Sequence, residues 1–310
     1  MQPSIGVAII THAAVKLLPK SMPPLLQSPL KARVLVVNSS SNDGTVELAR
    51  EMGAETLVNP RREFNHGSTR EAARKYLGTD IVVMITPDAI ASGPEMIGNL
   101  VRPLLEDNMI ALSYARQLPH DGADFFESFP RAFNYPDKSE VRSLTDVAKL
   151  GPRTFFCSDS CAAWSNRALD AIGGFETTLT AEDTIAAARL IYAGYKVAYT
   201  ADAVVRHSHR YSLKQEFKRY FDTGLMRRQY EDLLFRYARD EERGASFFLA
   251  MVSELIGSRP HLLPYAFAQA TAKFAGYKVG YHAQRAPLAL KRLLSSQDFY
   301  WTSTAVVRDS

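Results

Sequence analysis

The sequence predicts an α/β protein with a mainly parallel central sheet flanked by helices and followed by a C-terminal helical extension. Short apolar runs recur through the first part of the chain: IGVAII (5–10), RVLVV (33–37), IVVMI (81–85) and MIALSY (109–114). They are rich in Val and Ile and do not alternate with polar residues, as expected for strands that are covered on both faces. Helical patterns separate the runs, which indicates βαβ units.

The first elements follow in a regular order. After the second run, a helix is expected to start at Asp43 and to end at Gly53. The segment TREAARKYLG predicts a second helix that ends at Gly78. From about 116 to 153 the pattern loosens into Pro- and Asp-rich sequence. A long irregular segment inside a domain is typical of a loop that faces a substrate.

The later elements are shorter. FFCSDSCAAW (155–164) predicts a strand, and SNRALDAIGGF predicts a short helix capped by Ser165. TAEDTIAAARLIYAGY predicts a helix with Glu182 and Asp183 in its first turn, and KVAY and AVVRHSH predict two short strands. Beyond residue 211, large apolar residues recur at roughly helical spacing among Lys and Arg.

Length, composition and cysteine count limit the class of protein to which this chain can belong. The chain has 310 residues, 46% of them hydrophobic, and a formal net charge of +4, which fits one large domain with an appendage. Two cysteines, Cys157 and Cys161, are too few for a disulfide framework or a four-cysteine zinc site, so we expect buried reduced thiols. No basic leader and no apolar run of about 18 residues occurs, which predicts a cytoplasmic protein without a membrane span.

The basic charge is concentrated near the C-terminus. No Asp or Glu lies between Leu255 and Gln297, a stretch that contains six Lys and Arg residues. This asymmetry suggests contact with something anionic. A membrane surface and a helical cap on the catalytic domain are equally compatible with it, whereas the absence of a recognised nucleic-acid-binding fold argues against nucleic acid.

Polar residues follow several predicted strands at the sheet edge where α/β proteins bind ligands. They are Thr11 and His12, then Asn38 with Ser39–Ser41, then Asp88 in TPDA. Each could be a turn former, but together they suggest a nucleotide site. The sequence has no GxGxxG, no GxxxxGK[ST] and no GxSxG, which argues against three common α/β chemistries.

Two acidic features could carry chemistry. Asp88 follows a buried strand directly and could bind Mg²⁺ or Mn²⁺ with help from His207, although His207 or His209 could be a structural hydrogen-bonder instead. Glu182 and Asp183 could stabilise the start of their helix, or one of them could act as a general base. Spacing alone leaves both choices open.

The order of VLVVNSSSNDGT, FNHGSTR, TPDA, GGFETTLTAED and HSHRYSLKQEFKRYFDTG resembles bacterial family-2 glycosyltransferases, and most closely their rhamnosyltransferase branch. The resemblance runs from about Ile5 to Trp301 and implies the GT-A fold. It implies a catalytic domain at 1–210, with a nucleotide-sugar half at about 1–115 and an acceptor half at about 116–210. The helical extension then covers 211–310, and the oligomeric state stays open.

The resemblance also implies roles for individual residues. Asp183 matches the family's catalytic base, with Glu182 beside it, and Asp88 and His207 match metal ligands. Two positions depart from the family pattern: Asn38 replaces an aspartate, and Thr86 replaces the first aspartate of the DxD motif. The expected nucleotide-sugar-binding residues are Thr11, Asn38, Asn65, His66, Gly67, Arg70, Pro87 and Asp88. Gly67 would let the backbone approach the donor, and Arg70 would supply a cation near its diphosphate or base.

The reaction implied is inverting transfer of L-rhamnose from dTDP-β-L-rhamnose to a hydroxyl of a bacterial surface polysaccharide, of the O-antigen or capsule type. The cofactor would be Mg²⁺ or Mn²⁺, and the acceptor would be lipid-linked, with peripheral contact to the inner face of the plasma membrane. One alternative is a hexosyltransferase that uses a UDP- or GDP-sugar. Another is a catalytically weak, nucleotide-sugar-binding scaffold subunit, which Asn38 and Thr86 favour and the retained Asp88, Glu182 and Asp183 oppose.

Overall fold

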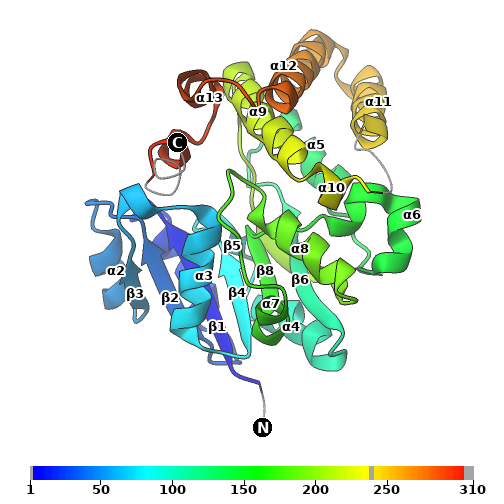
Figure 1. The fold of residues 1–310 in the computed structure, drawn as a ribbon. Coiled ribbons are helices and arrows are strands. Elements are labelled where there is room, and N and C mark those ends of the chain that lie inside the picture. Colours follow the sequence, from blue (N-terminus) through cyan, green and yellow to red (C-terminus); the bar gives the residue numbers. More distant parts are fainter. Residues whose placement is uncertain (1–2, 237–240, 304–310) are drawn as a thin grey trace.

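A computed structural model describes residues 3–236 and 241–303 (Figure 1). Within these residues, one nine-stranded sheet has the order β3-β2-β1-β4-β8-β6-β9-β5, and β7 pairs with β9. The strands are β1 (Ile5–Thr11), β2 (Arg33–Asn38), β3 (Glu55–Val58), β4 (Ile81–Ile85), β5 (Ile90–Ala91), β6 (Ile110–Leu118), β7 (Glu140–Arg142), β8 (Cys161–Ser165) and β9 (Lys196–Arg206).

Helices cover both faces of this sheet and form the C-terminal part of the chain. Those that connect the strands are α1 (Leu18–Leu26), α2 (Thr45–Glu51), α3 (His66–Leu77), α4 (Met96–Glu106), α5 (Phe125–Asn134), α6 (Val147–Leu150), α7 (Asn166–Ala171) and α8 (Glu182–Tyr192). Those that follow the last strand are α9 (Leu213–Gln229), α10 (Glu231–Leu234), α11 (Glu241–Ser258), α12 (Leu263–His282), α13 (Leu288–Leu294) and α14 (Asp298–Trp301).

Strand direction explains where ligand-binding residues gather. β2, β1 and β4 pair in parallel, β8 runs antiparallel to both β4 and β6, and β6 is parallel to β9. The carboxyl ends of β1, β2, β4, β6 and β9 therefore meet at one edge, and β8 starts there. The predicted α/β class with a mainly parallel sheet and C-terminal helices is confirmed.

The apolar strands lack alternation because both faces of the sheet are buried. Val7 and Ile9 of β1 belong to a core cluster that also contains α1 and α4 residues, whereas Ala8 and Ile10 belong to a second cluster with α3 and α8 residues. Cys157 and Cys161 are free and buried, as expected.

The segment from 116 to 153 is more regular than we predicted. β6 continues to Leu118, and α5 begins with a capping box in which Asp124 accepts from the backbone N–H of Glu127. Phe125 and Phe129 lie on one face of α5 and pack against α11 through Phe247. The capping box and the four-residue spacing of the phenylalanines were visible in the sequence, but Pro130 obscured them.

Two strand predictions were also wrong in extent. The strand predicted at 155–164 starts only at Cys161, because residues 151–155 form a 3₁₀ helix and the backbone N–H of Cys161 donates to Ser158 to close a turn. The two strands predicted at 196–199 and 203–209 are the single strand β9, which ends at Arg206. Its pairing with β6 shifts register between Thr200 and Val204, where the sequence had suggested a break.

The C-terminal helices gather above the carboxyl edge of the sheet in Figure 1. Helices α9 and α12 pack unusually closely, since a Cβ on Gly280 would lie 2.0 Å from the backbone oxygen of Phe221. Among the described residues, none of the helices combines the length and the apolar character that crossing a bilayer requires. The proposed boundary at residue 210 stays a prediction.

Candidate active site

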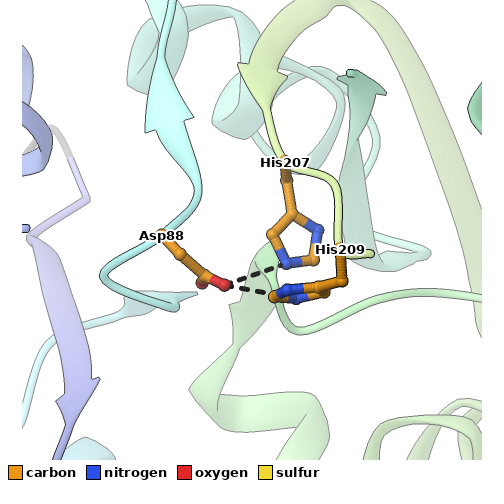
Figure 2. Close-up of side chains that lie close together, drawn as sticks. All are labelled: Asp88, His207 and His209. Carbon is orange, nitrogen blue, oxygen red and sulfur yellow. Dashed lines mark ion pairs between the residues drawn. The ribbon is translucent and has the colours of Figure 1, made fainter. Parts of the chain in front are cut away.

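A cluster of one carboxylate and two imidazoles lies at the carboxyl edge of the sheet (Figure 2). Asp88 follows β4, and His207 and His209 follow β9. The Oδ2 atom of Asp88 is 3.5 Å from Nε2 of His207 and 3.2 Å from Nε2 of His209. The sequence had named Asp88 and His207 as metal ligands, and the structure adds His209 to them as a candidate.

The protonation states in this cluster favour cation binding. Burial would raise the pKa of Asp88, but the hydrogen bond and charge of His207 outweigh it and hold that pKa below its usual range. Burial lowers the pKa of His207, and it lowers the pKa of His209 to about 4. Both imidazoles are therefore neutral near pH 7 and offer lone pairs. One carboxylate with two neutral imidazoles suits Mn²⁺ better than Mg²⁺.

A second layer of side chains fixes the ring of His207. Its Nδ1 lies 2.9 Å from Oε1 of Gln117, and Arg131 donates to the same oxygen at 2.6 Å. Because an amide oxygen only accepts, Nδ1 carries a proton. In the charged ring Nε2 also carries a proton and can donate it to Asp88, whereas in the neutral ring Nε2 has a lone pair that a cation beside Asp88 could accept. Sequence reasoning missed Gln117 and Arg131, because both lie in the stretch that it treated as an irregular loop or as its entry.

The predicted catalytic carboxylates stand at the start of α8. Ala181, which precedes them, has φ of +60°, a left-handed conformation that costs a residue with a Cβ about 1 kcal/mol or more. Asp183 accepts from the backbone N–H of Asp159 at 3.1 Å and from that of Thr184 at 2.6 Å. Burial, and then the charge of Glu182, raise the pKa of Asp183. A half-buried aspartate with a raised pKa can act as a general base.

Arg70 lies inside a buried group of carboxylates. Its Nε is 2.9 Å from Oδ2 of Asp159, and its Nη1 donates to Glu182. The side chain is only 5% exposed. Burial raises the pKa of Asp159, whose other oxygen accepts from the indole of Trp164 at 2.7 Å. The charge of Arg70 thus balances these carboxylates. Its expected place near the donor's diphosphate or base stays a prediction, since Arg70 also lines the pocket described below.

The turn formed by FNHG (64–67), at the start of α3, packs against a neighbouring loop. Asn65 caps α3 by accepting from the N–H groups of Gly67 and Ser68, and its Nδ2 donates to the carbonyl of Thr178 at 2.6 Å. A Cβ on Gly67 would lie 1.9 Å from the backbone oxygen of Glu176. The absence of a Cβ at Gly67 therefore leaves room for the loop that leads to Asp183, and the approach of a donor to this glycine stays a prediction.

The other predicted nucleotide residues differ in their accessibility. Thr11 donates to the carbonyl of Val37, and Asn38 is fully buried, with its amide bonded to Thr11 and Ser41. Asn38 therefore stabilises the turn after β2 by hydrogen bonds to Ser41. Pro87 lies in the turn between Thr86 and Asp88 and is partly exposed.

A pocket opens between the ends of β1 and β4, where the order of the strands reverses. Open α/β sheets bind ligands at such a point. Burial lowers the pKa of His66, one of its walls, to about 3, so that ring is uncharged. The lining residues are Ile10, Thr11, His12, Arg61, Phe64, His66, Arg70, Thr86 and Phe299. Sequence reasoning had named His12 as a strand-end residue but had missed Arg61, Phe64 and Phe299.

Comparison with known proteins identifies relatives over most of the chain. A family model described as "Glycosyltransferase like family 2" matches residues 25–222. The O-antigen chain rhamnosyltransferase RfbN of Salmonella typhimurium is 38% identical over 303 residues, which cover 96% of each chain. WbaN of Salmonella anatum, also described as an O-antigen chain rhamnosyltransferase, is 37% identical and covers 89% of this chain and 88% of its own.

Solved structures agree on the fold. The mannosyltransferase PcManGT from Pyrobaculum calidifontis, solved with GDP-Man and Mn²⁺, superimposes with a TM-score of 0.54. It is 20% identical, and the match covers 100% of this chain and 79% of the other. Residues 1–349 of TarS from S. aureus give a TM-score of 0.52 at 12% identity, with 91% of each chain covered. These likenesses support the GT-A architecture.

Proposed function

Because the chain belongs to the family-2 glycosyltransferases, we propose that it transfers L-rhamnose from dTDP-β-L-rhamnose to a lipid-linked oligosaccharide of a bacterial surface polysaccharide. The observation that carries this proposal is the identity of 38% to an O-antigen chain rhamnosyltransferase, which extends over 96% of both chains. The grouping of Asp88, His207 and His209 at the edge of the sheet supports a site for a nucleoside diphosphate sugar.

The reaction is a single displacement at the anomeric carbon. Asp183 accepts the proton of an acceptor hydroxyl while that oxygen forms a bond to the anomeric carbon and the bond to dTDP breaks. One displacement inverts the configuration, so a β-linked donor gives an α-L-rhamnoside. Asp88, His207 and His209 would hold a divalent cation, which would offset the charge on the departing diphosphate.

Donor binding tests the proposal directly. We expect calorimetry to show the tightest binding for dTDP-rhamnose among dTDP-rhamnose, UDP-glucose, UDP-galactose and GDP-mannose, and weaker binding when EDTA replaces Mn²⁺. Preference for a UDP- or GDP-sugar would identify a hexosyltransferase. Failure of all four to bind would contradict the proposed function, and binding without any consumption of the donor would favour the scaffold subunit.

Replacing Asp88 by Asn should weaken Mn²⁺ binding by more than the roughly 10- to 100-fold that loss of a ligand's supporting partner costs. The change removes the only carboxylate of the three-residue cluster. Mn²⁺ affinity can be followed by electron paramagnetic resonance of the free ion. Asp202→Asn is the matched control, since Asp202 pairs with Arg102 at the surface. Equal Mn²⁺ affinity in the Asp88 and Asp202 variants would place the cation elsewhere.

The C-terminal helices α11–α13 are proposed to rest on the cytoplasmic face of the membrane. Leu249, Phe274 and Leu293 are each at least 65% exposed, an unusual condition for such large apolar side chains. Helices α12 and α13 carry Lys and Arg, and no acidic residue occurs between 255 and 297. Near an anionic lipid surface, each Lys or Arg contributes about 1 kcal/mol.

Vesicle sedimentation checks this placement. We expect the protein to sediment with vesicles that contain phosphatidylglycerol, to sediment less at high salt, and to stay in solution with pure phosphatidylcholine. Replacing Phe274 and Leu293 by Ser should reduce the bound fraction, while Val58→Ser, an exposed position on β3, should not. Equal sedimentation of the two variants would favour the helices as a cap only.

A further inference from the structure

We infer that Phe299, carried by the C-terminal helix α14, is a donor-binding residue whose ring forms, with the guanidinium of Arg61, the wall on which the nucleobase stacks. This inference rests on the proposed function, since it assumes a nucleoside diphosphate donor. It goes further by assigning part of the donor site to the C-terminal end of the fold, outside the residues matched by the family model.

The first support is the composition of the wall. The Arg61 guanidinium lies over the Phe299 ring at 4.7 Å from its centroid, and the ring meets Phe64 edge to face at 5.2 Å. It also meets the uncharged ring of His66 at 5.9 Å. Flat aromatic and guanidinium surfaces bind nucleobases by stacking and cation–π contact.

The size of the pocket indicates which part of the donor it binds. Its volume is about 190 Å³, below the roughly 300–1,000 Å³ of sites that enclose a whole small molecule. One planar base fits such a space. The diphosphate would then continue toward Asp88, because Thr86, which lines the pocket, is only two residues from it.

The segment that carries Phe299 is firmly attached on both sides. Before it, the backbone N–H of Ser296 donates to Asp222 at 2.8 Å, and Lys218 donates to the carbonyl of Ser295. After it, Trp301 is 8% exposed and packs in a cluster with Leu179 and residues of α9. Helix α9 therefore holds the ring in place over the pocket.

The experiment compares Phe299→Ala, Phe299→Leu and Phe299→Tyr in the full-length protein, with dTDP and Mn²⁺ as the probe in calorimetry. Loss of one stacking contact should raise the dissociation constant of dTDP about 5- to 100-fold in the Ala and Leu variants. The Tyr variant should bind close to the unmodified protein. Phe267→Ala, the same change at an exposed position on α12, should bind normally.

A second probe distinguishes the loss of base recognition from a general loss of binding by a misfolded protein. Pyrophosphate with Mn²⁺ should bind equally to the unmodified protein and to Phe299→Ala, because pyrophosphate has no base. Unchanged dTDP affinity in the Ala and Leu variants would overturn the inference, as would an equal loss for dTDP and pyrophosphate. If the unmodified protein binds no nucleotide at all, the proposed function itself fails, which is a different result.

Discussion

Asp183→Asn is expected to lower turnover by about 10²- to 10⁴-fold, the usual contribution of a general base, while donor binding stays largely intact. The amide keeps the size of the carboxylate, so the start of α8 should not move. It cannot accept the acceptor's proton. The measurement is release of dTDP from dTDP-rhamnose with a lipid-linked oligosaccharide acceptor, alongside calorimetry of dTDP. Turnover equal to that of the surface control Asp202→Asn would refute the assignment.

The pH profile gives a second test of the same residue. Burial and Glu182 raise the pKa of Asp183, and a general base works only when it is deprotonated. Turnover should therefore fall as the pH drops through the raised pKa, at a higher pH than for an ordinary aspartate. The residual activity of Asp183→Asn should lack this acidic limb. If the limb persisted in the variant, another group would be responsible.

Arg70→Met should lower the free energy of unfolding by about 3–5 kcal/mol, because removal of one partner leaves buried carboxylates without a compensating charge. The guanidinium pairs with both Asp159 and Glu182, and all three side chains are at most 7% exposed. Urea unfolding followed by circular dichroism measures the change. Arg102→Met is the matched control, since the exposed Arg102–Asp202 pair should contribute no more than about 1 kcal/mol.

The destabilisation by Arg70→Met should also depend on pH. Without the cation, which lowers the pKa of Asp159, burial holds that pKa still further above its unfolded value. The folded variant then binds more protons than the unfolded chain, so its stability falls as the pH rises. We expect a smaller deficit at pH 5 than at pH 8. A deficit that is constant with pH would point to lost packing rather than to uncompensated charge.

The sequence predicted the parallel half of the fold well, because its strands are buried on both faces and read as continuous apolar runs. It predicted the stretch from 116 to 165 poorly. There, Pro130 lies inside α5, and the turn at Ser158–Cys161 interrupts what looks like one apolar strand. The packing of α5 against α11 and the ion pair between Asp159 and Arg70 help to fix these segments, and neither is a local property.

Asp88 stands out in the sequence because it follows a strand directly, and the structure places it beside His207 and His209. Other residues are harder to assign, because their side chains could serve either the ligand or the fold. Arg70, Gly67 and Asn65 have the residue types of a ligand site, but in the structure they hold Glu182 and the loop before it. Phe299 could not be found from local sequence, because only the attachment of α14 to α9 brings it to the pocket.

The composition of the pocket wall has a consequence for the order of events during synthesis. Eight of the nine lining residues lie between positions 10 and 86, and the ninth is Phe299, which is 213 residues after Thr86 (299 − 86). At ribosomal rates of about 5–20 residues per second, that interval lasts on the order of 10 to 40 s. A nascent chain can thus form its first strands well before the base-binding wall exists. Nucleotide capture would then begin only when the C-terminal helices have docked, so a ribosome-bound fragment would not sequester the donor.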